Sequence, residues 1–169
     1  MMTGLRPYVA DMLHRPNARR DVRIDASHLD GVSVAATVLD PDEPLILTAT
    51  LECVADGIVV RGRVTGRWQA PCACCLIEAG GPLDCSISEL FEANPIEGET
   101  YQLGDDEIDL EPAVRDAVLP ELPAAPRCRD DCQGLCAGCG ADRNVADCEC
   151  DPEPPDPRWD ALAELRLSS

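Results

Sequence analysis

The sequence predicts an α+β fold: a small, mainly antiparallel β domain with one or two helices, followed by a C-terminal zinc-binding cysteine module. Apolar and polar residues alternate within 45–91, a helical spacing follows near residue 104, and residues 128–150 hold six of the 11 cysteines. We therefore divide the chain into an N-terminal arginine-rich arm (1–30), an α+β core domain (31–127), the cysteine-rich zinc module (128–151), and an acidic, proline-rich linker with a short C-terminal helix (152–169).

The N-terminal arm combines a local positive charge with low hydrophobicity. Residues 1–23 contain five arginines and two aspartates. We expect a solvated terminal segment, with contact to RNA as the alternative. No apolar run of signal-peptide length occurs in the arm, and no stretch of the chain approaches the roughly 20 apolar residues of a membrane span. These features predict a cytoplasmic protein whose thiols stay reduced.

Two strands and a tight turn follow the arm. LILTATLECV (45–54) alternates with period two and indicates a half-buried strand. Asp56-Gly57 indicates a hairpin turn, and the strand after it has Ile58, Val60, Val64 and Trp68 on one face and Arg61, Arg63 and Arg67 on the other. We interpret the arginine stripe as a solvated face, with a binding role as the alternative.

A third strand and two helices complete the expected elements. LDCSISELF (83–91) alternates again, so Cys53 and Cys85 are interpreted as small core residues. A helix is expected where Leu110, Val114, Ala117 and Val118 follow an Asp109 N-cap, with Pro112 in its first turn and LPELPAAP ending it. In RWDALAELRL, the residues Trp159, Leu162 and Leu165, with Leu167 as an optional fourth member, form a short apolar stripe, which predicts a helix that docks on the body or on a partner.

The spacing of the cysteines predicts two structural zinc ions. Pairs of thiolates two or three residues apart can hold one zinc ion from a tight turn, and zinc takes four such ligands. Combining these cysteine pairs by their spacing gives one site of Cys72, Cys75, Cys128 and Cys132, and a second site of Cys136, Cys139, Cys148 and Cys150. Cys74 is then a spare thiol of the first turn.

Other uses of the cysteines remain open alternatives. One competing arrangement places Cys128, Cys132, Cys136 and Cys139 on a single ion and leaves Cys148 and Cys150 accessory. Redox catalysis would need a C-x-x-C that opens a helix after a strand, and catalytic zinc usually recruits histidine or a carboxylate. Nothing around residues 72–75 resembles a strand followed by a helix, and the two histidines, His14 and His28, lie far from every cysteine in the sequence. An iron–sulfur cluster also uses four cysteines, but the compact turns favour zinc.

The net charge of -18 favours a protein partner over nucleic acid. A chain this acidic is repelled by phosphate and attracts basic proteins. The sequence contains no nucleophile with an adjacent base, no paired catalytic carboxylates and no phosphate-binding glycine loop. We therefore expect a protein that is not an enzyme and has neither a small-molecule substrate nor a membrane partner.

Several stretches together resemble the YceD family of bacterial proteins, which is associated with accumulation of large-subunit ribosomal RNA. They are the C-x-x-C-L turn at Cys72 to Leu76, EIDLEPAVRDAVLPELP, CRDDCQGLCAGCGADRN with CEC after it, and the terminal DPRWDALAEL. The similarity covers roughly residues 40–169. It departs at Cys74, where relatives often have arginine, so an RNA contact by that arginine is not expected here.

The resemblance implies a process, ribosome assembly, and two hypotheses follow. The first is a non-catalytic biogenesis factor that supports 23S rRNA processing and accumulation and large-subunit assembly through an acidic surface that binds a basic ribosomal or RNA-processing protein. The alternative is a zinc-dependent RNA-binding module that contacts rRNA or a pre-50S particle directly. The first hypothesis predicts binding to basic proteins that weakens as salt is added. The second predicts direct affinity for RNA, which also falls with salt.

Overall fold

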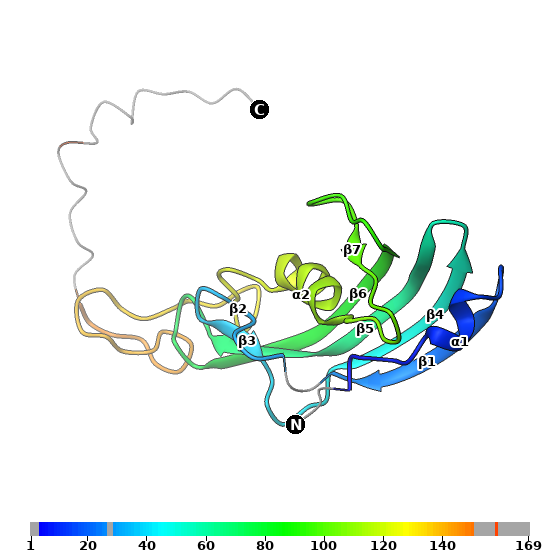
Figure 1. Cartoon of the computed structure of the whole chain (residues 1–169). Helices are drawn as coiled ribbons and strands as arrows, with labels where there is room; N and C mark the ends of the chain where they lie inside the picture. The colour runs from blue at the N-terminus through cyan, green and yellow to red at the C-terminus, as the bar shows by residue number, and fades with distance from the viewer. Residues whose placement is uncertain (1–3, 27–28, 151–157, 159–169) are drawn as a thin grey trace, which may run out of the picture.

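A curved, mainly antiparallel β-sheet forms the body of the protein, and one helix lies across its concave face (Figure 1). The computed structural model describes residues 4–26, 29–150 and 158. The sheet strands are β1 (Arg19–Asp25), β2 (Ser33–Val34), β3 (Thr37–Leu39), β4 (Ile46–Val54), β5 (Gly57–Pro71), β6 (Glu78–Glu92) and β7 (Tyr101–Gln102). The helical elements are α1 (Ala10–Leu13), α2 (Glu111–Val118) and the 3-10 turn η1 (Leu119–Glu121). The predicted α+β class is confirmed.

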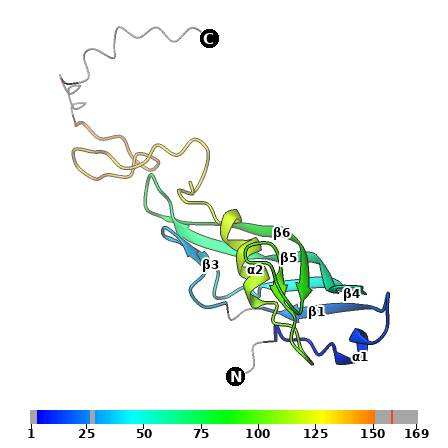
Figure 2. The same ribbon diagram turned by 45° about the horizontal axis from the view of Figure 1, so that its top comes forward.

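The long strand β5 organises the sheet. It pairs with β4 and then β3 along one edge, and with β6 along its whole length on the other. β1 extends the sheet beyond β4, β2 pairs with β3, and β7 joins the end of β6 in parallel. Because β5 and β6 each run for 15 residues, their hairpin carries its closing turn beyond the rest of the sheet (Figure 2).

The β4–β5 hairpin has the predicted faces and a turn displaced by one residue. Leu47, Ala49 and Leu51 are buried on the core side of β4, as their alternation predicts. Val54 pairs with Gly57, so the turn consists of residues 55 and 56, and the predicted Asp56-Gly57 turn is wrong by one position. Gly57 is required for a different reason, because a Cβ there would lie 1.9 Å from the carbonyl oxygen of Phe91 on β6.

The core side of the sheet packs against α2. The inward residues of β5 and β6 are buried as predicted, except that Trp68 is only partly buried, and Cys53 and Cys85 are core residues. Leu110, Val114 and Val118 are fully buried at the α2 interface. The helix begins at Glu111 with Leu110 as its N-cap, one residue later than predicted, although Asp109 Oδ1 accepts the Glu111 N–H at 3.1 Å.

The arginine-rich arm is folded onto the body over its described residues, which corrects the expectation of a solvated segment. β1 pairs with β4 along its whole length, and Leu5, Val9 and Met12 are buried. Arg6 pairs with Asp109 at 2.6 Å. The half-buried Val22 and Ile24 alternate with charged residues, a strand pattern that the high arginine content obscured.

The boundaries of the four predicted segments remain a prediction. The expected linker and C-terminal helix (152–169) lie, apart from Arg158, outside the described residues. None of the helices in the described part of the chain is long and apolar enough to cross a membrane.

Candidate metal centres

The first cysteine group, Cys72, Cys75, Cys128 and Cys132, joins the tip of the β5–β6 hairpin to the segment after η1. Its four sulfur atoms lie within 4.8 Å of one another. Across the two segments, Cys75 Sγ is 3.6 Å from Cys128 Sγ, and Cys72 Sγ is 3.9 Å from Cys132 Sγ. The group is surrounded by a small apolar cluster that includes Trp68, Ala79 and Leu135. It therefore links two segments that are more than fifty residues apart in the sequence.

The backbone of the hairpin turn directs N–H groups at the first sulfur. Cys72 Sγ accepts the N–H of Cys74 at 3.4 Å and the N–H of Cys128 at 3.3 Å. These backbone donors stabilise the thiolate and lower the pKa of Cys72 to about 6. Burial and the neighbouring thiols raise the pKa of Cys128 to about 12. Four thiols this close cannot all ionise unless a cation neutralises them, so the donor set fits a thiophilic divalent metal.

The second cysteine group, Cys136, Cys139, Cys148 and Cys150, is local in the sequence and open to solvent. Its sulfur atoms also lie within 4.8 Å of one another, and Cys139 and Cys150 are exposed. The backbone N–H of Cys139 and a hydrogen bond from Cys148 lower the pKa of Cys136 to about 6. Cys150 has a pKa raised by its contacts with the thiols of Cys139 and Cys136. The same electrostatic reasoning therefore applies to this group.

The two groups use the same backbone turn. In the first turn, Leu76 N–H donates to the carbonyl of Cys72 at 3.0 Å, and in the second, Gly140 N–H donates to the carbonyl of Cys136 at 2.8 Å. The residue after the second cysteine has a left-handed backbone in both, with φ of 64° at Leu76 and 73° at Gly140. A turn of this kind points backbone amides at sulfur, as metal-binding turns require.

Residues between the groups hold them together. Leu135 N–H donates to the carbonyl of Cys74 at 3.1 Å, and Asn144 Nδ2 donates to Cys132 Sγ at 3.4 Å. Asn144 Oδ1 also accepts the N–H of Gln133 at 2.8 Å. No local sequence pattern marks Asn144, because its contacts with Cys132 and Gln133 arise only when the chain turns back between residues 134 and 143.

The observed grouping coincides with the division expected from spacing. Among the residues that the structure describes, the competing set of Cys128, Cys132, Cys136 and Cys139 is not one of the groups gathered within this distance. Cys74 belongs to neither group. The donor chemistry suits a metal in each group, and bound metal would supply a covalent cross-link and neutralise the thiolates. The ligand assignments themselves remain a prediction.

Comparison with known proteins identifies the family of this chain. The sequence model described as "Large ribosomal RNA subunit accumulation protein YceD" matches residues 60–166. This chain belongs to the YceD family. Its match spans both cysteine groups and α2, so the predicted resemblance is confirmed.

Relatives extend the match over nearly the whole chain. A protein of Mycobacterium tuberculosis is 31% identical over 164 residues, which cover 93% of this chain and 79% of the relative. A protein of Mycobacterium leprae is 32% identical and covers 89% of this chain and 72% of the relative. The chloroplastic "Large ribosomal RNA subunit accumulation protein YCED homolog 1" of Arabidopsis thaliana is 37% identical over 60 residues, 36% of this chain and 19% of that protein. No solved structure matches.

Proposed function

We propose that this YceD-family chain is a non-catalytic cytoplasmic factor in 23S rRNA processing and accumulation and in large-subunit assembly, and that its acidic surface binds a basic ribosomal or RNA-processing protein. The name of the family supports the link to large-subunit rRNA. The observation that carries the choice of partner is the distribution of charge. The chain has 32 acidic and 14 basic residues, and among the residues that the structure describes at least seven arginines are already paired with carboxylates of the protein.

The ion pairs reduce the capacity of the arginine stripe to bind phosphate. Arg63 pairs with Asp84 at 2.7 Å, and Arg61 pairs with Glu52 at 3.3 Å. RNA would have to displace these carboxylates, and it would meet a strongly negative overall potential. The arginines of the stripe therefore gain less from a phosphate than solvated arginines would.

Exposed acidic residues are concentrated in the segment between β6 and α2. We define the acidic surface by five exposed carboxylates that lie within a stretch containing no basic residue: Glu97, Glu99, Asp105, Asp106 and Glu107. A cationic protein is drawn to such a surface by long-range attraction, and salt weakens that attraction. A basic ribosomal protein has the complementary charge.

The metal groups have a structural role in this proposal. Each group holds one zinc ion, so that the hairpin tip, the segment after η1 and residues 136–150 form a defined unit without a large core. All eight proposed ligands are cysteines, and a closed four-cysteine site leaves no position for substrate. The proposal therefore assigns the zinc to architecture and not to catalysis.

Direct binding of rRNA is the second candidate function, and one observation favours it. Arg23 and Arg67 make no ion pair among the described residues, and both extend from the solvent-facing side of the sheet. These two guanidinium groups are available for phosphate contacts, together with Arg61 and Arg63 if their pairs exchange.

A binding comparison on the full chain tests the proposal. We expect the chain to bind ribosomal proteins extracted from purified large subunits more tightly than 23S rRNA fragments at about 0.15 M salt, where the Debye length is about 8 Å. Neutralising the five carboxylates of the acidic surface should weaken protein binding, whereas the matched control R61Q/R63Q/R67Q should not. Tight rRNA binding that the arginine variant abolishes, with no affinity for any basic protein, would establish the RNA-binding alternative instead.

A further inference from the structure

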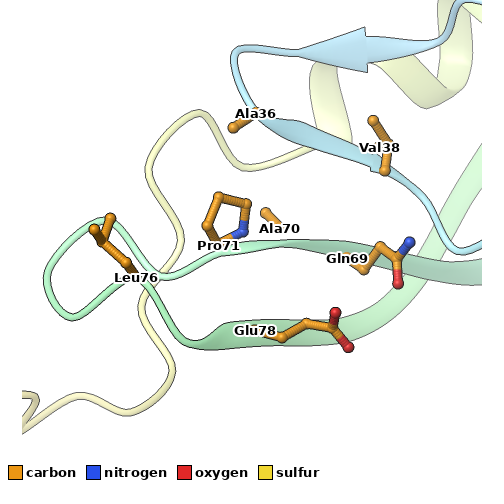
Figure 3. Close-up of a pocket in the computed structure, with 7 residues that line it drawn as sticks. All are labelled: Ala36, Val38, Gln69, Ala70, Pro71, Leu76 and Glu78. Atoms are coloured by element: carbon orange, nitrogen blue, oxygen red, sulfur yellow. The ribbon is translucent and has the colours of Figure 1, made fainter.

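A shallow groove lies beside the first cysteine turn. It has a volume of about 250 Å³ and is formed by the β2–β3 hairpin, the end of β5 and the hairpin tip (Figure 3). Val38 and Ala36 form one side, Ala70 and Pro71 lie along β5, and Leu76 lies at the tip. Gln69 and Glu78 add polar groups at one end. Most of the lining is therefore apolar, next to the position where the cysteine module joins the sheet.

Leu76 occupies a backbone conformation that favours glycine. Its φ of 64° lies in the left-handed region, where a bulky residue is an outlier and carries an energetic cost. The equivalent position of the second turn is Gly140, with φ of 73° and the same backbone hydrogen bond. The chain thus builds one turn twice and places leucine where glycine forms the turn without strain.

The described chain offers no packing that compensates for this strain. Leu76 is 65% exposed, and its neighbours Ile77 and Val38 are 49% and 39% exposed. An exposed leucine at a strained position stabilises neither its own turn nor the core. Strained positions of this kind often belong to contact sites, and clustered exposed apolar side chains mark surfaces that become covered.

We propose that the C-terminal segment of the same chain covers this groove, with Trp159, Leu162 and Leu165 packing on Leu76 and Val38. These three residues recur at intervals of three, so a helix would place them along one side, and a helix this short needs a docking surface. The groove supplies an apolar surface of the kind that such a stripe requires.

The connection between the groove and the segment makes the docking geometrically reasonable. The last continuous described segment ends at Cys150, whose sulfur lies in the same group as that of Cys136. The residue before Cys136, Leu135, donates its backbone N–H to the carbonyl of Cys74 at the hairpin tip, so the start of the C-terminal segment is close to the groove. Residues 151–158 are rich in proline and span roughly 25 Å when extended, at about 3.1 Å per residue. A tether this short gives an effective concentration in the millimolar range, so weak apolar contacts are sufficient for docking.

Fluorine NMR on the full-length chain tests this proposal. The protein has two tryptophans, so labelling with 5-fluorotryptophan gives one signal from Trp68 and one from Trp159, which W68F and W159F assign. We expect the Trp159 signal to be shielded from solvent relative to the same residue in a synthetic peptide of residues 151–169. L76G and V38S should each convert the Trp159 signal to that of the peptide.

Matched controls separate docking from folding. I96S removes an apolar side chain that is 55% exposed and lies outside the groove, and it should leave the Trp159 signal unchanged. L76G should unfold at a midpoint close to that of the wild type, since glycine suits the left-handed turn. A wild-type Trp159 signal identical to that of the peptide, or one that L76G and V38S do not alter, would overturn the proposal. A signal that changes on dilution would also overturn it and assign the groove to a second copy of the chain.

Discussion

Residues 72–76 and 136–140 form the same cysteine turn in two different surroundings. In the first, Cys72 and Cys75 are buried, and the turn closes a loop of more than fifty residues with Cys128 and Cys132. In the second, Cys139 is exposed and all four cysteines lie within 136–150. The comparison shows that one chemical unit can serve a whole domain or only its own segment, depending on the sequence distance that it spans.

Acidification should affect both groups together and gives the largest expected effect. Backbone N–H groups lower the pKa of Cys72 and of Cys136 to about 6, so these thiolates persist well below the ordinary thiol pKa and are lost as pH falls through about 6. Metal binds the thiolate form of all four cysteines in a group, so protons compete with it, and the metal content and the stability that it confers should fall as the pH is lowered through the acidic range. Zinc release measured with a colorimetric chelator, alongside circular dichroism, checks this.

A metal content that does not change over the whole acidic range would contradict the assignment of these thiolates as ligands. A variant with all four cysteines of the second group changed to serine should release only one metal over the same range. It provides the matched control for the behaviour of the first group.

Serine substitution of one cysteine in each group should separate their roles. The wild-type chain should contain close to two zinc ions, and C75S and C139S close to one each. C75S removes the cross-link that closes the long loop, and a chain-entropy estimate for a loop of about 50 residues gives a loss of about 4 kcal/mol in global stability. C139S should disorder residues 136–150 and leave the unfolding of the sheet nearly unchanged.

Elemental analysis, thermal unfolding and amide hydrogen exchange measure these differences. Identical global unfolding of C75S and C139S would show that the ligand division is wrong. C74S is the control, since Cys74 belongs to neither group and its loss should leave the metal content unchanged.

Exchanging the residues that follow the two turns should give the smallest effect. G140L introduces a side chain at φ of 73°, where a Cβ would meet no atom within 4 Å, so the backbone conformation alone sets the cost, about 1 kcal/mol. L76G relieves the same strain but adds the conformational entropy of glycine to the unfolded chain, and the two effects nearly cancel. Zinc affinity measured by chelator competition should fall for G140L and change little for L76G. Equal losses for both variants would contradict the strain argument.

Local patterns made much of this structure predictable. Alternation of apolar and polar residues predicts the strands in 45–54 and 83–91 and the burial of Cys53 and Cys85. The close spacing of the cysteines in pairs predicts how eight of them gather in two groups of four. The β4–β5 turn was predicted one residue too late, because Gly57 was interpreted as a turn residue with a free backbone. Glycine is needed at position 57 for another reason, the close approach of the Phe91 backbone. A contact between strands that are distant in the sequence has no local signal.

The N-terminal strand and the groove were missed for related reasons. In β1 the residues between charged side chains are only partly buried, because β1 lies at the edge of the sheet and, among the described strands, pairs with β4 alone. The strain at Leu76 could be suspected only by comparison with Gly140, once both turns were known to have the same geometry. Charge composition describes a surface well, but it does not show which segments share that surface.

The sequence distances within the two cysteine groups also set an order in time. During synthesis, residues 136–150 can gather as soon as they have left the ribosome, because their four sulfurs require no other part of the chain. Cys72 and Cys75 leave the ribosome earlier but must wait for Cys128 and Cys132, and therefore for β6 and α2 between them. The partly made chain thus carries a pair of reactive thiols at the hairpin tip, which closure of the first group conceals. Occupancy of that group would report that the body of the protein has finished folding.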